Sequence, residues 1–131
     1  MSTVQRVAQV FGIVFILVAI LGFVTSGGSM DADPATAPRL LGLFAVNVLH
    51  NVVHLLFGVW GLLAARSFPA AKTYGMVGGI AYIALAALGY VTPDLLGLVP
   101  IGGHDIWLHA LLGIVLAVVG FTAKPPAAIT I

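Results

Sequence analysis

Long runs of apolar residues alternate with short segments rich in turn-forming residues along the chain. Four such runs occupy residues 7–25, 46–65, 74–91 and 105–122. Each is close to the roughly 20 apolar residues that a helix needs to cross the hydrocarbon core of a bilayer. Between the runs, loops or turns are expected over residues 26–38, 66–73 and 92–103. The pattern therefore predicts an all-α protein with four membrane-spanning helices.

The first apolar run also has features of a secretory signal peptide, because Arg6 precedes it. Its apolar stretch is longer than the roughly 7–15 residues typical of such peptides, and a later part of the chain repeats it. We therefore expect it to be a retained helix.

Composition supports a membrane location. The chain of 131 residues is 61% hydrophobic and 7% charged, whereas a soluble domain carries about 25% charged residues. A net charge of +1 provides no electrostatic basis for nucleic-acid binding, so no nucleic-acid partner is expected. The absence of cysteine excludes disulfides and cysteine-ligated metal sites within this chain.

The basic residues are distributed unevenly around the predicted helices. One side of the membrane would carry Arg6, Arg66, Lys72 and Lys124. The other side would carry Arg39 and all the aspartates. Basic residues favour the cytoplasmic side, so both termini are expected in the cytoplasm. Residues 124–131 follow the last run and begin a proline-containing stretch, which predicts a frayed tail.

Two parts of the sequence repeat each other. Residues 79–92 match residues 12–25 at eight of fourteen positions, including the shared ending Leu-Gly-aromatic-Val-Thr. Residues 97–113 align with 42–58 at a shift of 55. The second and fourth apolar runs are therefore equivalent, as are the first and third.

The repeat predicts how the helices assemble. Residues 1–131 would form one membrane domain built from two parallel copies of a helical hairpin, about 7–66 and 74–123. Parallel repeats of this kind are related by a pseudo-two-fold axis along the membrane normal. Four helices arranged in this way would close into a bundle.

Polar residues interrupt the second and fourth runs at helical spacing. His50 and His54 are four residues apart in the second run, as are Asp105 and His109 in the fourth. Residues at this spacing lie on one face of a helix. The repeat equates His50 with Asp105 and His54 with His109, so all four side chains are expected to meet at one depth. The glycines one turn deeper, at positions 58 and 113, are expected to let these two helices approach.

Three imidazoles and a carboxylate can bind zinc or another transition metal. The predicted metal ligands are His50, His54, Asp105 and His109. Ionisable residues inside a membrane are rare and usually functional. The sequence offers no serine with a nearby His/Asp pair, so no catalytic residue is assigned.

Two other interpretations of the polar cluster remain open. The histidines can form a purely structural hydrogen-bonded network with Asn47, Asn51 and Asp105, without any cofactor. Alternatively, His54 and His109 can be the axial ligands of a haem or another tetrapyrrole. His104 would stand just outside the cluster in each case, at the mouth of the fourth helix.

The polar motifs also resemble a known family. The segment from Leu41 to Gly58, with the later Asp-x-Trp-Leu-His-xxx-Gly that begins at Asp105, is similar to the domain of unknown function 4383 family. The resemblance covers about residues 7–122 and implies a small four-helix membrane protein, typically of an actinobacterial plasma membrane. It implies these motif positions: Asn47, His50, Asn51, His54, Asp105 and His109. The chain departs from the family pattern at Ala45, often proline, and at His104, usually a small residue.

The leading functional hypothesis is a small integral membrane protein that binds a transition metal near the outer face. It could instead be an accessory subunit of a larger membrane complex, with lipid, other subunits or further copies of itself as partners. The alternative is a non-catalytic structural subunit with a buried polar network. Enzymatic action would require the metal to activate water, which the sequence neither shows nor excludes.

Overall fold

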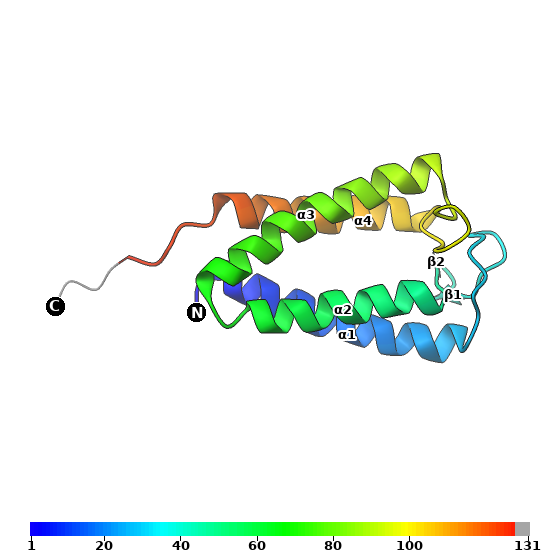
Figure 1. Cartoon of the computed structure of the whole chain (residues 1–131), viewed down its shortest axis with the longest axis horizontal. Helices are drawn as coiled ribbons and strands as arrows, with labels where there is room; N and C mark the ends of the chain where they lie inside the picture. Colours follow the sequence, from blue (N-terminus) through cyan, green and yellow to red (C-terminus); the bar gives the residue numbers. More distant parts are fainter. Residues whose placement is uncertain (128–131) are drawn as a thin grey trace.

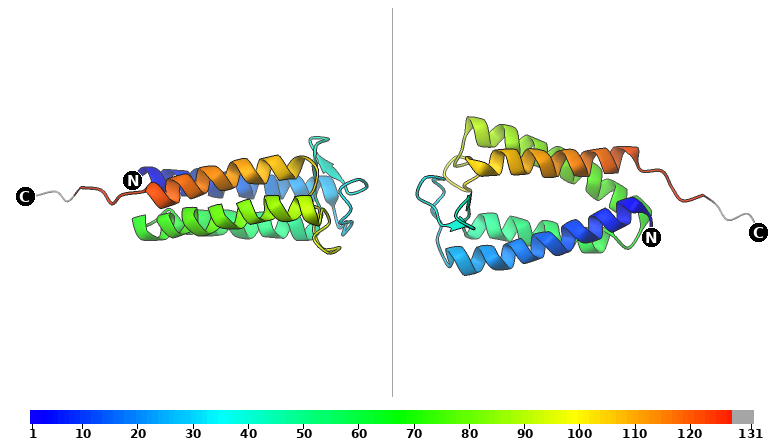
Figure 2. Two further views of the ribbon diagram at one scale, coloured as in Figure 1. Left: turned by 90° about the horizontal axis from the view of Figure 1, so that it is seen from above. Right: turned by 180° about the vertical axis from the view of Figure 1, so that it is seen from behind.

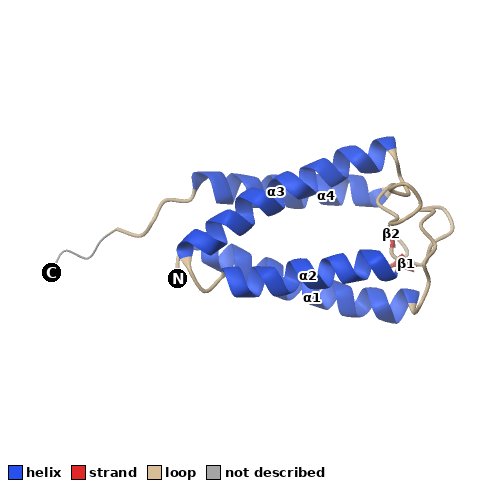
Figure 3. Ribbon diagram, in the orientation of Figure 1, coloured by secondary structure: helices blue, strands red, loops and turns tan. Residues whose placement is uncertain are grey.

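The computed structural model describes residues 1–127 and is mainly helical over that range (Figures 1 and 3). Its helices are α1 (Thr3–Ser26), α2 (Val48–Ala64), α3 (Phe68–Val91) and α4 (His104–Thr122). A short antiparallel hairpin of β1 (Arg39–Leu40) and β2 (Phe44–Ala45) precedes α2. The helices form two hairpins, α1 with α2 and α3 with α4, that lie side by side as a bundle (Figure 1). The predicted all-α bundle of two hairpins is confirmed.

The helices have the length and surface expected for a membrane protein. Three of those described, α1, α3 and α4, are long and apolar enough to cross a membrane. The fourth, α2, is apolar but has 17 residues, which correspond to about 26 Å of helix. Large apolar side chains such as Leu17, Leu111 and Val118 are about half exposed on the outer surface. Such a surface is suited to contact with lipid tails.

The α3 helix begins earlier than expected. Ser67 caps it with its hydroxyl, which accepts a hydrogen bond from the backbone N–H of Ala70, and Pro69 occupies its first turn. Proline is well tolerated there, because the first helical N–H groups have no intrahelical partner. The predicted turn over 66–73 is therefore wrong from Phe68 onward, where the chain is already helical.

Glycines bring the two helices of each hairpin into close contact. A Cβ atom added to Gly58 would lie 2.9 Å from the carbonyl oxygen of Gly12, and one added to Gly113 would lie 3.0 Å from that of Gly79. The same crossing thus recurs in both hairpins at positions that the repeat equates. The expectation that Gly58 and Gly113 bring α2 and α4 together is wrong, because each faces the other helix of its own hairpin.

The connections at one end of the bundle repeat each other as well. Both contain Leu-Leu-Gly-Leu, and Leu41 and Leu96 have φ of +55° and +58°. The following Gly42 and Gly97 are also left-handed, with φ of +71° and +82°. Non-glycine residues rarely adopt this conformation, so the two turns are alike at these two positions, although Leu95 is also left-handed (φ +44°) and its counterpart Leu40 is not.

The start of α1 and the end of α4 lie at the other end of the bundle (Figures 1 and 2). The N-terminus and the start of the tail are both found there, as the paired hairpins require. Residues 124–127 have no regular secondary structure. The rest of the predicted tail, 128–131, lies outside the described residues.

Candidate metal centre

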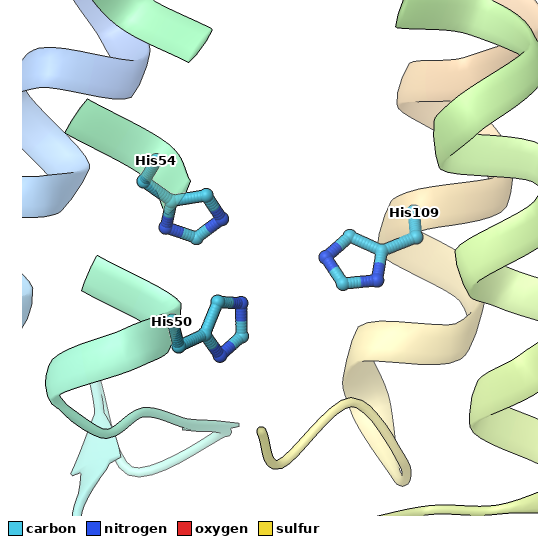
Figure 4. Close-up of side chains that lie close together, drawn as sticks. All are labelled: His50, His54 and His109. Carbon is cyan, nitrogen blue, oxygen red and sulfur yellow. The ribbon is translucent and has the colours of Figure 1, made fainter. Parts of the chain in front are cut away.

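Three histidines from two helices point toward one another in the interior of the bundle (Figure 4). We call His50 and His54 of α2 and His109 of α4 the histidine group. Their side chains are buried, and one ring nitrogen of each lies within 4.8 Å of the others. The sequence analysis predicted that these residues lie on the inward faces of two helices and meet at one depth. In the structure the two faces are next to each other.

The start of α2 is held in place by Asn47. Its Oδ1 accepts a hydrogen bond of 2.9 Å from the backbone N–H of His50, which caps the helix. Its Nδ2 donates a 2.9 Å bond to the carbonyl of Leu98, in the loop of the other hairpin. Asn47 therefore fixes His50 and ties the two hairpins together at the depth of the histidine group.

The ring of His50 has a defined orientation. Its Nδ1 lies 3.1 Å from the carbonyl oxygen of Ala45 in β2. A carbonyl can only accept, so this contact favours the tautomer that carries the proton on Nδ1. Metal-ligating histidines commonly donate their second N–H to a carbonyl in this way.

Asp105 lies beside the group rather than within it. Its carboxylate is buried, and Oδ2 is 3.8 Å from Nε2 of His50. Within the described part of the chain, Asp105 Oδ2, His54 Nδ1 and His109 Nδ1 form no hydrogen bond. Three of the predicted ligands thus form a compact group, and the fourth contacts one of them.

Two aromatic residues that the sequence analysis did not include pack on the histidines. Phe15 of α1 stacks on His54, with ring centroids 5.6 Å apart. Tyr82 of α3 meets His109 edge to face at 5.2 Å, and the Phe15 and Tyr82 rings stack at 5.3 Å. The repeat pairs Phe15 with Tyr82, so their shared position was visible in the sequence. Its relation to the histidines required the helix packing.

Two of the predicted supporting residues face elsewhere. Asn51 donates a 2.9 Å hydrogen bond to Ser26 Oγ and packs against Gly22, so it joins α2 to α1. His104 is exposed, and its Nδ1 accepts a 3.1 Å bond from the indole N–H of Trp107. Neither side chain adds a donor atom to the histidine group.

The histidine group has the chemistry of a transition-metal site. Two donor atoms bound to one tetrahedral zinc ion, each at about 2.0–2.2 Å, are about 3.3–3.6 Å apart. The 3.8 Å separation between Asp105 Oδ2 and His50 Nε2 is slightly longer than that spacing. The imidazole nitrogens, spread over as much as 4.8 Å, would have to draw together by about 1–1.5 Å around an ion.

A family model described as Domain of unknown function (DUF4383) matches residues 5–122. The match runs from the first turn of α1 to the last residue of α4 and includes the whole histidine group. No curated protein and no solved structure matches the chain.

Proposed function

Because the chain belongs to the DUF4383 family, whose description assigns no function, we propose a function from the site itself, namely binding of a transition metal inside the membrane. The ligands would be His50, His54, His109 and Asp105. Three imidazole nitrogens and one carboxylate oxygen suit zinc and related divalent ions.

One observation supports this proposal most strongly. One ring nitrogen of each of three buried histidines lies within 4.8 Å of the others, and the buried Oδ2 of Asp105 beside them has no hydrogen-bond partner among the described residues. An unsatisfied buried polar group costs about 1–3 kcal/mol. A metal ion bound by the converging ring nitrogens would also give the Asp105 oxygen a partner, which a purely structural network does not.

A haem has less support. It would need a wide flat space around the line between His54 and His109. The ring of His50 lies in that neighbourhood, with its centroid 4.5 Å from that of His54 and 5.9 Å from that of His109. Three converging imidazoles favour a bare ion over a tetrapyrrole held by two.

The proposed setting is a bacterial plasma membrane with both termini in the cytoplasm. The histidine group is near the loop end of the bundle, so this orientation puts the ion near the outer face. There the protein could store, sense or deliver the metal, alone or as an accessory subunit of a membrane complex.

A second candidate is a non-catalytic subunit that serves only as a scaffold. The link from Asn47 to Leu98 favours it, because this bond joins the hairpins without any cofactor. In that case the histidine group would only fix the helix packing.

Elemental analysis and a visible spectrum of the purified protein test the proposal. We expect about one metal ion per chain and no Soret band. Replacing both His54 and His109 by Gln should lower metal affinity at least tenfold while the bundle still folds, because amides keep hydrogen bonds but ligate poorly.

The matched control is His104→Gln, which changes the exposed histidine outside the group. It should leave metal binding unchanged. Stoichiometric metal in the double variant would contradict the ligand assignment, a Soret band would favour haem, and metal-free wild-type protein that cannot be loaded would favour the scaffold.

A further inference from the structure

Two cavities reach the histidine group from different gaps in the bundle. The larger, about 320 Å³, lies between α1 and α4, and the smaller, about 60 Å³, lies between α2 and α3. The repeat equates these gaps: Phe15 and Val46 line the larger cavity where Tyr82 and Ile101 line the smaller. Similar walls thus enclose very different volumes, so the α1/α4 gap has room that its counterpart lacks.

The larger cavity is apolar along its length and polar at its inner end. Val10 and Val14 of α1 and Leu112 of α4 are among its apolar lining residues. Its polar lining residues are the histidine group and Asp105. Val10 and Val14 are also 56% and 47% exposed on the lipid-facing surface. They therefore mark a mouth that opens sideways between α1 and α4, the two helices nearest the viewer in the right-hand panel of Figure 2.

The end of this cavity that faces the loops is lined by apolar side chains of the β1–β2 hairpin. Leu40, Leu41 and Phe44 line it there, with Leu40 8% exposed and Leu41 80% exposed. An apolar lining at the loop end and a mouth on the lipid side indicate a ligand with an apolar chain.

We propose that the α1/α4 cavity binds a long-chain carboxylate, with its alkyl chain between the helices and its head group at the metal. This inference rests on the proposed metal centre. A volume of 320 Å³ is at the lower end of the about 300–1,000 Å³ of small-molecule sites. It holds a head group and the first part of a chain, and the rest of the chain would extend into lipid.

Charge selects the head group. A divalent ion with neutral imidazoles and the Asp105 carboxylate has a net charge of +1. Net charge is costly in a low-dielectric interior, and a monoanionic carboxylate cancels it. Zinc can accept a fifth ligand. Neutral heads such as alcohols or quinones would leave the charge uncompensated.

The test uses the full chain in detergent with Co²⁺ in place of zinc, because the visible absorption of Co²⁺ responds to its ligands. Dodecanoate is the probe. Acetate supplies the same head group without a chain, and dodecanol supplies the same chain without a charge. We expect dodecanoate to shift the Co²⁺ spectrum and dodecanol to leave it unchanged.

Two variants determine whether the alkyl chain occupies this cavity. Val10→Trp fills the chain's path without touching the metal ligands. Val77→Trp is the matched control, since Val77 is the repeat counterpart of Val10, is 51% exposed and does not line the smaller cavity. Val10→Trp should weaken the dodecanoate response at least tenfold and keep the acetate response, and Val77→Trp should change neither.

The outcomes separate the two proposals. Without a Co²⁺ spectrum in wild-type protein, the metal centre fails and this inference with it. A Co²⁺ spectrum that dodecanoate does not shift overturns the inference alone. An undiminished dodecanoate response in Val10→Trp, or an equal response to dodecanol, also overturns it and leaves the metal centre standing.

Discussion

At the scale of single residues, Asp105 has the most demanding position. Its carboxylate is 2% exposed inside a bundle with a lipid-facing surface, 3.8 Å from His50 Nε2. Insertion of an aspartate at the centre of a membrane helix costs about 2.5–3.5 kcal/mol, and the cost is lower near a helix end. Retaining such a group is consistent with a cation at this site.

The Asp105→Asn substitution distinguishes a metal site from a structural network. It removes a negative ligand and keeps the shape, so we expect metal affinity to fall about 10–100-fold, as for other substitutions around metal sites. The metal-loaded variant should unfold at a lower temperature than the metal-loaded wild type. Competition with a chelator and thermal unfolding would measure the two effects.

The metal-free proteins provide the internal control for this substitution. Without an ion, Asp105→Asn should be neutral or stabilising, because the desolvation of a charge is no longer required. Clear stabilisation of the variant in metal-loaded preparations would contradict the metal centre.

At the scale of helices, the glycine crossings set the spacing within each hairpin. A Cβ on Gly58 would lie 2.6 Å from Ile16 Cγ1, besides its approach to the α1 backbone. A Cβ on Gly78 would meet its nearest neighbour, Leu116 Cδ1, at an ordinary 3.4 Å. The two positions therefore respond differently to one added methyl group.

Gly58→Ala should destabilise the bundle by about 1–3 kcal/mol, because the helices have to move apart. Gly78→Ala, the matched substitution in another helix interior, should be neutral or stabilising by about 0.5–1 kcal/mol, since alanine is the better helix former. Reversible unfolding in mixed micelles would measure both. Equal losses at the two positions would argue against a close crossing at Gly58.

Much of this architecture could be predicted from the pattern of apolar residues. The helical spacing of His50, His54 and His109 was sufficient to expect one cluster, since those residues share inward faces. The helix that Gly58 contacts was not predictable. Helical spacing shows which residues share a face of α2, but it does not show which neighbouring helix that face meets. Likewise, apolarity alone did not show that Ser67 would start α3 before the apolar run begins.

At the scale of the whole molecule, charge differs between the two ends of the bundle. Lys72 is near the termini, where its ammonium group donates to the carbonyl of Ala123 at 2.9 Å. Asp31 and Asp94 lie in the connections at the opposite end. Basic residues favour the cytoplasmic side of a membrane. This distribution of charge therefore predicts that the end with the termini faces the cytoplasm.

Single cysteines would test that orientation, because the chain has no cysteine of its own. Ser29→Cys lies at the loop end and Ser67→Cys at the end of the termini. In intact cells, an impermeant thiol reagent should label Ser29→Cys and leave Ser67→Cys unlabelled until the membrane is opened. The reverse pattern would invert the topology.

The unequal gaps on the two sides of the bundle have a consequence for the ancestry of this fold. In a dimer of identical hairpins, symmetry makes both gaps the same, and any mutation that widens one widens the other. Gene duplication and fusion remove that constraint, since each copy then mutates alone. Cavities of 320 and 60 Å³ at equivalent positions are therefore a difference that a dimer of identical hairpins could not have and that two separately mutating copies can acquire.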